Sequence, residues 1–272
     1  MIKKLRRRLR ALWCRLKLAL RWRFRRPAPA HGRNRELVVS LTSYPKRFSS
    51  LHLTLRSLLT QSVRPDRVIL WLAEADRSAL PAAVEALQQE GLEIRYCDDL
   101  RSFKKIIPTL SSFPEADIVT ADDDLYYWSD WLKELVVAAE RFPGKVVAHR
   151  LHKVACDGHG IRSYREWPKN ISDQTEDPRN FATGCLGVFY PAGCFHPDVL
   201  DRDAFMRLCP EADDVWLYWM VRRNGRFEVH SGTRHGQVNW PGSQQVSLWK
   251  RNRHRHGNDA QIQAMVETYG RP

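Results

Sequence analysis

The sequence lacks the patterns that mark several common protein classes. It has no G-x-x-x-x-G-K-[ST] phosphate loop and no G-x-S-x-G elbow, which disfavours NTPase and serine hydrolase chemistry. Its six cysteines show no paired CxxC spacing and are too sparse for a secreted disulfide scaffold, which predicts reduced thiols and a cytoplasmic protein. We find no internal repeat. With 272 residues, 43% of them hydrophobic, the chain can bury the core of one large domain or two small ones.

Acidic residues are absent from the first 35 positions, and this absence accounts for the formal net charge of +13. The stretch holds 14 of the 44 Lys and Arg residues, so the remaining 30 basic residues face all 31 acidic ones. The rest of the chain is therefore close to neutral. A positive charge spread over a folded face would indicate nucleic acid as a partner, but this charge is confined to one end of the chain.

The basic stretch has the pattern of an amphipathic helix, which we place at residues 1–26. Its large apolar residues recur at spacings of three and four: Ile2, Leu5, Leu9, Leu12, Trp13, Leu16 and Leu20. No uncharged run in it reaches ten residues, which is too short for a bilayer span or a signal peptide core. We expect it to lie on an anionic membrane surface, where each basic residue adds about 1 kcal/mol. The alternative is a solvated or nucleic-acid-binding tail, although interleaved leucines gain nothing from phosphate contacts.

A linker rich in Pro and Gly, residues 27–35, separates this helix from a folded domain expected over residues 36–272. Apolar runs and helical patterns alternate through most of that domain. We expect strands over 37–44, 67–75, 92–99, 116–123, 145–150, 184–191 and 226–230, and helices over 50–61, 81–90, 104–110, 129–141, 213–225 and from 258 onward. This rhythm predicts an α/β fold of Rossmann type, in which helices flank a mostly parallel sheet. Residues 150–182 are polar and are expected to be irregular.

Three successive carboxylates, Asp122, Asp123 and Asp124, follow the strand expected at 116–123. Like charges this close repel each other, so water, basic groups or a metal ion must neutralise them. The D-x-D spacing of Asp122 and Asp124 allows two carboxylates to act on one hard cation and its bound phosphates. Because ligands gather at the carboxyl ends of parallel strands, we predict a site for Mn²⁺ or Mg²⁺ here.

The stretch "LVVSLTSYPKRFSSLHLTLRSLLTQSVRPDRVILWLAEAD" resembles the opening strand, helix and second strand of GT-A-fold nucleotide-sugar glycosyltransferases of the bacterial family-two type. These enzymes contribute to surface polysaccharide synthesis. The resemblance is good over residues 37–140 and thinner over 183–224. It implies a GT-A-like domain, a nucleotide-diphosphate sugar donor and a divalent metal held by Asp122 and Asp124.

The resemblance also implies a donor site. Tyr44 takes the place of the aromatic residue that stacks on the base, and Glu74 stands where the family usually has an Asp that holds the base edge. Lys104 or Lys105 is the nearest match to the basic residue on the diphosphate. The implied nucleotide-sugar-binding residues are Thr42, Ser43, Tyr44, Arg47, Glu74, Lys104, Lys105, Asp122 and Asp123.

A second acidic pair, Asp213 and Asp214, opens the helix expected at 213–225. It resembles the family's E-D-x-x-L pattern, in which the second acid is the general base, with Asp in place of Glu at the first position. A carboxylate beside the acceptor hydroxyl can take its proton, which is worth about 10²- to 10⁴-fold in rate. The alternative is that either residue caps the helix. The expected stereochemical outcome is inversion, although a retaining enzyme can carry the same D-x-D.

Late histidines are candidates for a third metal ligand, because some metal-dependent GT-A enzymes complete their coordination with one. The candidates are His230, His235, His254 and His256, whose spacing forms no metal motif by itself. The basic run 249–256 fits either a flap that closes on the diphosphate or a solvated stretch of charge.

These features lead to one principal interpretation. The chain is expected to transfer a sugar from a nucleotide-diphosphate sugar to a hydroxyl group of a glycan or lipid-linked saccharide, such as lipopolysaccharide or capsule. We expect it at the inner face of the cell membrane, with residues 1–26 on the anionic surface and no nucleic acid partner. The alternatives are a metal-dependent phosphoesterase or nucleotidyltransferase, which also use carboxylate clusters, and a non-enzymatic membrane- or nucleic-acid-binding module.

Overall fold

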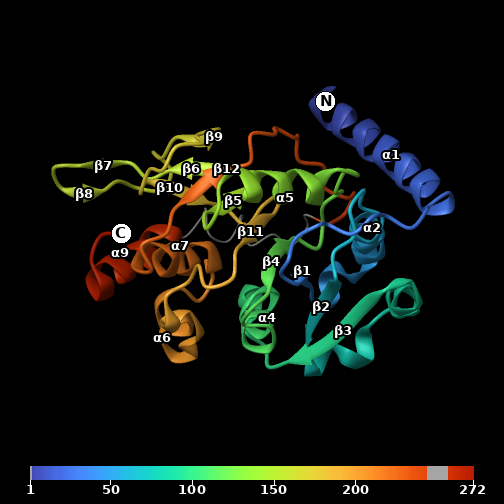
Figure 1. Cartoon of the computed structure of the whole chain (residues 1–272), viewed down its shortest axis with the longest axis horizontal. Coiled ribbons are helices and arrows are strands. Elements are labelled where there is room, and N and C mark those ends of the chain that lie inside the picture. The colour runs from blue at the N-terminus through green and yellow to red at the C-terminus, as the bar shows by residue number, and fades with distance from the viewer. Residues whose placement is uncertain (1, 244–256) are drawn as a thin grey trace.

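The computed structural model describes residues 2–243 and 257–272, and its centre is a seven-stranded sheet (Figure 1). The strands are β1 Leu37–Thr42, β2 Arg67–Ala73, β3 Leu92–Cys97, β4 Asp117–Ala121, β5 Val146–Ala148, β11 Val188–Tyr190 and β12 Glu228–His230. Their order in the sheet is β12-β5-β11-β4-β1-β2-β3. Only β11 runs antiparallel to its neighbours β4 and β5. The predicted mostly parallel α/β sheet is therefore confirmed.

Helices cover both faces of this sheet (Figure 1). The α-helices of the body are α2 Phe48–Leu59, α3 Ala82–Glu85, α4 Ile107–Ser112, α5 Trp131–Arg141, α6 Arg202–Leu208, α7 Asp213–Arg223 and α9 Gly257–Tyr269. The 3₁₀ helices are η1 Pro45–Arg47, η2 Glu74–Ala79, η3 Ala86–Glu90, η4 Arg101–Lys105 and η5 Pro197–Leu200. Side chains alternate across each strand, so Val147 belongs to the core cluster that includes residues of α2, α3 and α5, whereas Val146 and Ala148 belong to the cluster that includes residues of α4, α6, α7 and α9.

The amino-terminal helix α1, Ile2–Arg23, lies along the outer side of the body beside α2 (Figure 1). Ala11, Cys14 and Leu18 are buried against the body. The large apolar residues on the opposite face are exposed: Leu9, Leu12, Trp13, Leu16 and Leu20. The sequence pattern places an apolar face on one side of this helix and a cationic face on the other. In the structure, small and apolar side chains also lie opposite the exposed leucines and pack on the body.

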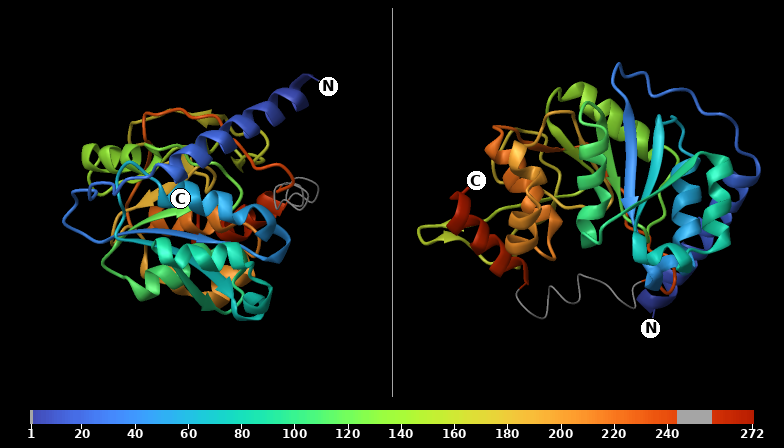
Figure 2. Two further views of the ribbon diagram at one scale, coloured as in Figure 1. Left: turned by 90° about the vertical axis from the view of Figure 1, so that its right-hand side faces the viewer. Right: turned by 90° about the horizontal axis from the view of Figure 1, so that it is seen from below.

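Residues between α1 and β1 also lie against the body. Arg25 pairs with Glu90 at 2.7 Å, and Arg33 pairs with the buried carboxylate of Asp117 at 2.7 Å. Figure 2 shows this stretch of chain running around the outside of the sheet to reach β1. The stretch that the sequence marks as a linker thus holds the helix in a defined place.

The expectation of an irregular segment at 150–182 is wrong. The segment contributes a small antiparallel sheet in the order β10-β6-β9, made of β6 Leu151–Lys153, β9 Lys169–Ile171 and β10 Asn180–Ala182. It also forms the hairpin of β7 Cys156–Asp157 and β8 Gly160–Ile161. These strands have only two or three residues each, which is too short for an alternating pattern to be recognised. The second sheet lies next to β5 and β12 (Figure 1).

Candidate active site

The acidic turn, which we define as Asp122 to Asp124, follows β4 directly and lies beside the end of β1. Because β1 and β4 are paired in parallel, their carboxyl ends meet at one edge of the sheet. Ser43 donates a hydrogen bond of 2.6 Å from its hydroxyl group to Asp123. The Arg47 guanidinium lies 2.9 Å from Asp123 and 2.7 Å from Asp124. Ser43 and Arg47, which follow β1, thus join the end of β1 to the acidic turn.

Lys105 supplies the second basic group beside the acidic turn. Its ammonium group forms a buried ion pair of 2.7 Å with Asp213 at the start of α7. Burial disfavours the ammonium charge, but Asp213 and Asp122 outweigh this and raise the pKa of Lys105. Lys105, one of the two lysines expected on the diphosphate, and Asp213 are therefore brought beside the D-x-D.

Burial leaves the two D-x-D carboxyls with raised pKa values. It raises the pKa of Asp122 to about 6 against the attraction of Lys105, and Asp123 adds repulsion. Burial and repulsion from Asp122 and Asp123 raise the pKa of Asp124 to about 7, although Arg47 opposes them. The two basic groups therefore neutralise the acidic turn only in part.

This remaining negative charge fits a hard divalent cation. Among residues 2–243 and 257–272, no group of three or more His, Cys, Asp or Glu side chains is arranged to hold a metal. Mg²⁺-like ions bind through one or two carboxylates and take the other ligands from water and substrate phosphates. Asp122 and Asp124 supply the two carboxylates, so the site suits an ion that arrives with a diphosphate.

The segment 238–240 closes the acidic turn from the other side, although no local sequence pattern marks it. The Trp240 amide donates to the Asp124 carbonyl at 3.1 Å, and the Asn239 side-chain amide lies 3.5 Å from the Asp124 carboxylate. The Trp240 indole N–H donates to Thr54 on α2 at 2.9 Å. Residues far apart in the chain are thus joined at the predicted metal site.

Asp213 and Asp214 have different surroundings although they are adjacent. Neither side chain caps α7 by a hydrogen bond, because the N-cap residue is Ala212. Asp213 is held by Lys105, whereas Asp214 has no ion-pair partner among the described residues and accepts only from the Val215 amide at 3.0 Å. Burial and repulsion from Asp213 raise the pKa of Asp214 to about 7. Of this pair, Asp214 is therefore the carboxyl that can gain or lose a proton near neutral pH.

A turn between β10 and β11, Thr183 to Gly187, completes the site. A Cβ atom on Gly184 would lie 2.9 Å from the Lys105 ammonium nitrogen, so glycine leaves room for Lys105. Leu186 has a φ of 72°, a strained conformation of the kind that gathers at functional sites. The Trp131 indole N–H holds the Leu186 carbonyl at 2.6 Å. Gly184 and Gly187, next to the strand expected here, were the sequence signal that could have predicted this turn.

The remaining predicted donor residues lie along the ends of β1, β2 and β3. The Thr42 hydroxyl donates to the Trp71 carbonyl at 2.8 Å, and Tyr44 is partly buried with the Arg47 guanidinium 5.8 Å from its ring. Glu74 is exposed and forms an ion pair with Arg77 at 2.9 Å. Lys104 pairs with Asp99 rather than with the acidic turn. Their roles toward a nucleotide stay predictions.

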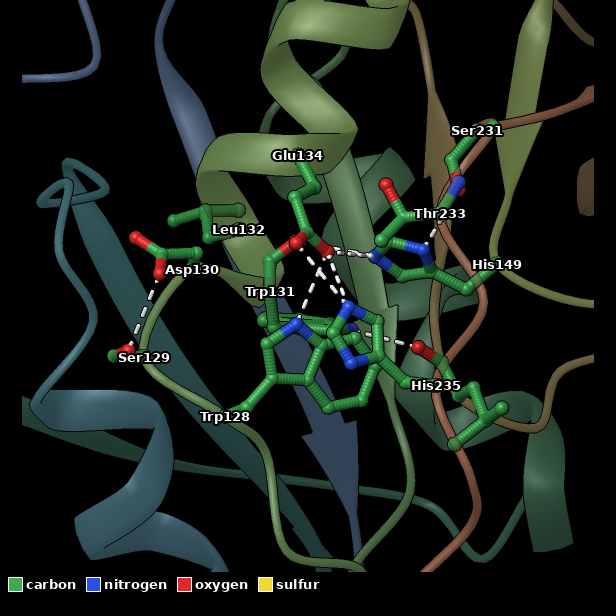
Figure 3. A network of polar contacts seen from close by, with 12 residues as sticks. Trp128, Ser129, Asp130, Trp131, Leu132, Glu134, His149, Ser231, Thr233 and His235 are labelled. Atoms are coloured by element: carbon green, nitrogen blue, oxygen red, sulfur yellow. Dashed lines mark hydrogen bonds and ion pairs between the residues drawn. The ribbon is translucent and has the colours of Figure 1, made fainter.

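Neither described histidine candidate lies on the acidic turn. His235 stacks on Trp128 with ring centroids 3.4 Å apart and contacts the Glu134 carboxylate at 2.9 Å (Figure 3). His230 lies buried in β12, and its Nε2 is 3.2 Å from the His149 carbonyl. Both rings are thus engaged in structural contacts. The other two candidates, His254 and His256, and the basic run 249–256 lie outside the described residues.

Comparison with models of known protein families finds no match, and comparison with curated protein sequences finds none either. Many solved structures resemble the chain, and three of them are described here. The mannosyltransferase PcManGT from Pyrobaculum calidifontis, in complex with GDP-Man and Mn²⁺, is 14% identical over 98% of this chain and 73% of its own, with a TM-score of 0.51. TarS from S. aureus, residues 1–349, is 11% identical over 86% and 72%, with a TM-score of 0.50.

The third is glucosyl-3-phosphoglycerate synthase from Mycobacterium tuberculosis, in complex with Mn²⁺, UDP and glucosyl-3-phosphoglycerate. It is 13% identical over 92% of this chain and 87% of its own, with a TM-score of 0.49. Identities this low establish the architecture alone. The chain has the GT-A fold, as the resemblance predicted.

Proposed function

We propose that the protein is a metal-dependent glycosyltransferase that moves a sugar from a nucleotide-diphosphate sugar to a hydroxyl group of a glycan acceptor. The proposal rests on one observation above all. A GT-A fold brings the D-x-D of Asp122 and Asp124 into one cluster with Lys105 and with Asp214, a carboxyl whose pKa is about 7. The structural neighbour PcManGT is described in complex with GDP-Man and Mn²⁺, which supports the same donor chemistry here.

In this proposal Asp122 and Asp124 would hold Mn²⁺ or Mg²⁺ against the diphosphate. When bound, such an ion acts as a Lewis acid on the leaving group. Lys105 and Arg47 carry fixed positive charge beside the acidic turn, so they are placed to attract the diphosphate and to balance the charge that develops on it. The Asp123 carboxylate already binds Ser43 and Arg47, so its role is to hold the acidic turn in place.

Asp214 takes the proton of the acceptor hydroxyl as its oxygen attacks the sugar carbon. A single displacement by this activated oxygen predicts inversion at the sugar carbon. The anomeric configuration of the product, measured by NMR immediately after transfer, tests it: the opposite configuration to that of the donor supports the assignment, and the same configuration excludes it.

Product analysis tests the reaction class. The protein is incubated with a panel of nucleotide sugars and Mn²⁺, and the released nucleotide is identified. Free nucleoside diphosphate supports the transferase, whereas monophosphate or inorganic phosphate supports the phosphoesterase or nucleotidyltransferase alternative. We expect Asp122→Asn and Asp124→Asn to abolish the release and the exposed control Asp203→Asn to leave it unchanged. Unchanged release in all three variants would contradict the proposal.

We further propose that the acceptor is held at an anionic membrane and that α1 binds this surface. The exposed stripe of α1, Leu9, Leu12, Trp13, Leu16 and Leu20, faces away from the body, and basic side chains lie on either side of it. In the described ranges no helix is long and apolar enough to cross a bilayer. The stripe suits a helix that lies in the interface, with the body held on the water side. This geometry also fits the predicted place at the inner face of the cell membrane.

Vesicle co-sedimentation tests the membrane proposal. Leu12→Gln combined with Leu16→Gln removes two exposed leucines that the body does not contact, so the fold should remain intact. The matched control is Val137→Gln, which removes an exposed apolar residue from α5. We expect the double variant to lose most binding to anionic vesicles and the control to keep it. Equal binding of both variants would remove α1 as the membrane element.

A further inference from the structure

Helix α1 contacts the chain that leaves the acidic turn. The Arg21 guanidinium donates to the Tyr127 carbonyl at 3.0 Å and lies 5.5 Å from the centre of the Tyr126 ring. Tyr127 is fully buried, and its hydroxyl group accepts a hydrogen bond of 2.7 Å from the Asp122 amide. Two hydrogen bonds therefore connect α1, through a single tyrosine, to the first aspartate of the D-x-D.

A second set of contacts joins α1 to the chain on the opposite side of the acidic turn. Arg10 donates to the Gly236 carbonyl at 3.1 Å. Ala11 packs with Val238 in a small buried cluster. The next two residues of the chain contact the carboxylate and the carbonyl of Asp124. Helix α1 thus supports both sides of the acidic turn.

The two supporting segments also bind each other. The Tyr126 amide donates to the Val238 carbonyl at 2.9 Å, and the Tyr126 ring lies edge-on to Trp240 with ring centroids 5.9 Å apart. Helix α1 therefore packs on one connected layer that holds the acidic turn. A cation bound through two carboxylates needs both in fixed positions, so a loss of this support adds an ordering cost to binding.

We propose that α1 is a structural component of the donor site, with Arg10 and Arg21 as positioning residues. Docking of α1 on the body and binding of metal and diphosphate at the acidic turn then favour each other by the same free energy, because such coupling is reciprocal. The inference rests on the proposed function, which assigns the metal and the diphosphate to this turn. It goes beyond that function, in which α1 serves only as the membrane element.

The arrangement leaves the membrane role of α1 intact. Its exposed leucines lie on the side away from the body, whereas the contacts with the two supporting segments come from the side that faces the body. The helix can therefore bind a surface and support the site at the same time.

Hydrogen exchange tests the coupling in the unmodified full chain. Amide exchange along α1 is followed with Mn²⁺ alone, with a nucleoside diphosphate alone and with both, using UDP, GDP, ADP and CDP in turn. Isothermal titration shows which pair binds. We expect that pair to slow exchange along α1, because binding favours the docked helix. Unchanged exchange along α1 with a bound pair would overturn the inference. If no pair binds, the result counts against the proposed function instead.

Substitutions test the coupling in the other direction. Arg10→Gln combined with Arg21→Gln removes the hydrogen bonds from α1 to the two segments. We expect the affinity for Mn²⁺ and the diphosphate to fall about fivefold or more, the lower end of typical coupling between sites. The matched control, Arg8→Gln combined with Arg15→Gln, removes the same charge from exposed positions of α1 and should bind as wild type does.

A further variant separates support of the site from general stability. Arg33→Gln removes the ion pair with Asp117, which lies at the other end of β4 from the acidic turn. It should lower the melting temperature and leave the affinity unchanged. Wild-type affinity in the Arg10 and Arg21 double variant, or an equal loss of affinity in Arg33→Gln, would overturn the positioning role. The exchange measurement needs no variant, so it decides the question even if the double variant does not fold.

Discussion

At the scale of single residues, Asp213 and Asp214 have identical side chains but different surroundings, and these surroundings suit them to different roles. Asp213 neutralises a buried lysine, and Asp214 keeps an unpaired carboxyl in a partly buried position. The sequence identified the pair but left their roles open between capping and catalysis. The structure separates them, because only one of the two carboxylates has Lys105 within ion-pair distance.

Substitutions at these two positions should therefore act differently. Asp214→Asn should lower kcat by about 10²- to 10⁴-fold while keeping or raising stability, since it removes a partly buried carboxylate that has no ion-pair partner among the described residues. Asp213→Asn should lower the free energy of unfolding by about 3–5 kcal/mol, because Lys105 loses its buried partner. Urea denaturation together with single-turnover rates measures both. Similar effects of the two substitutions on stability and on rate would contradict this division.

The raised pKa of Asp214 predicts a pH dependence. A general base must be unprotonated, so kcat should rise through about pH 7 and then level off.

The effect of the Asp214 pKa on stability has the opposite sign. The folded pKa of Asp214 lies above its ordinary value of 3.8, so the folded state takes up a proton as pH falls through about 7. Wild type should therefore lose stability relative to Asp214→Asn as pH rises from about 4 to about 7, measured as the difference in melting temperature.

A flat kcat profile between pH 6 and 8 would exclude Asp214 as the base. If the difference in melting temperature between wild type and Asp214→Asn does not change with pH, the Asp214 carboxyl has the same pKa in the folded and unfolded states. The two readouts are independent, because the first needs an acceptor and the second does not.

At the scale of elements, the turn between β10 and β11 positions Lys105. Gly184→Ala places a methyl group 2.9 Å from the Lys105 ammonium nitrogen, and the buried pair with Asp213 limits how far the lysine can retreat. We expect weaker donor binding with little loss of secondary structure. Gly158→Ala is the control, because no atom lies within 4 Å of its Cβ position and its φ is not strained. Isothermal titration with nucleoside diphosphate compares them, and equal affinities would contradict the role of this turn.

Helix α1 is attached through a half-buried arginine. The Arg21 guanidinium donates to the Tyr127 carbonyl at 3.0 Å and to the Ser57 carbonyl at 3.1 Å. Arg21→Ala should therefore loosen α1 and increase amide hydrogen exchange along it. Arg15→Ala on the exposed side should not. Equal exchange in the two variants would mean that the remaining apolar contacts, such as those of Leu18, hold the helix by themselves.

The long elements could be predicted from the sequence because their patterns are strong. The buried runs of β1, β2 and β4 and the helical spacing of α2, α5 and α7 fall where they were expected, within a few residues. The strands β6 to β10 could not be, since pairs and triplets of residues carry no period. Helix α6 was missed for the same reason: it has seven residues and only its Asp201 cap to mark it.

At the scale of the whole molecule, the sequence could predict the residues on the acidic turn and at the start of α7, because each follows a recognisable strand or opens a recognisable helix. Asn239 belongs to no local pattern, and only the fold brings it to the acidic turn. The net positive charge of the chain is concentrated at its amino-terminal end, in α1 and the stretch that follows it.

The central claim is that Asp122 and Asp124 hold a divalent ion against a nucleotide diphosphate. Its most direct test is the melting temperature of wild type and of Asp124→Asn, measured with a panel of nucleotide sugars in the presence and absence of Mn²⁺. We predict that at least one nucleotide sugar raises the melting temperature of wild type only with Mn²⁺, and that Asp124→Asn abolishes the rise. A rise that is independent of Mn²⁺, or that persists in Asp124→Asn, would contradict the account.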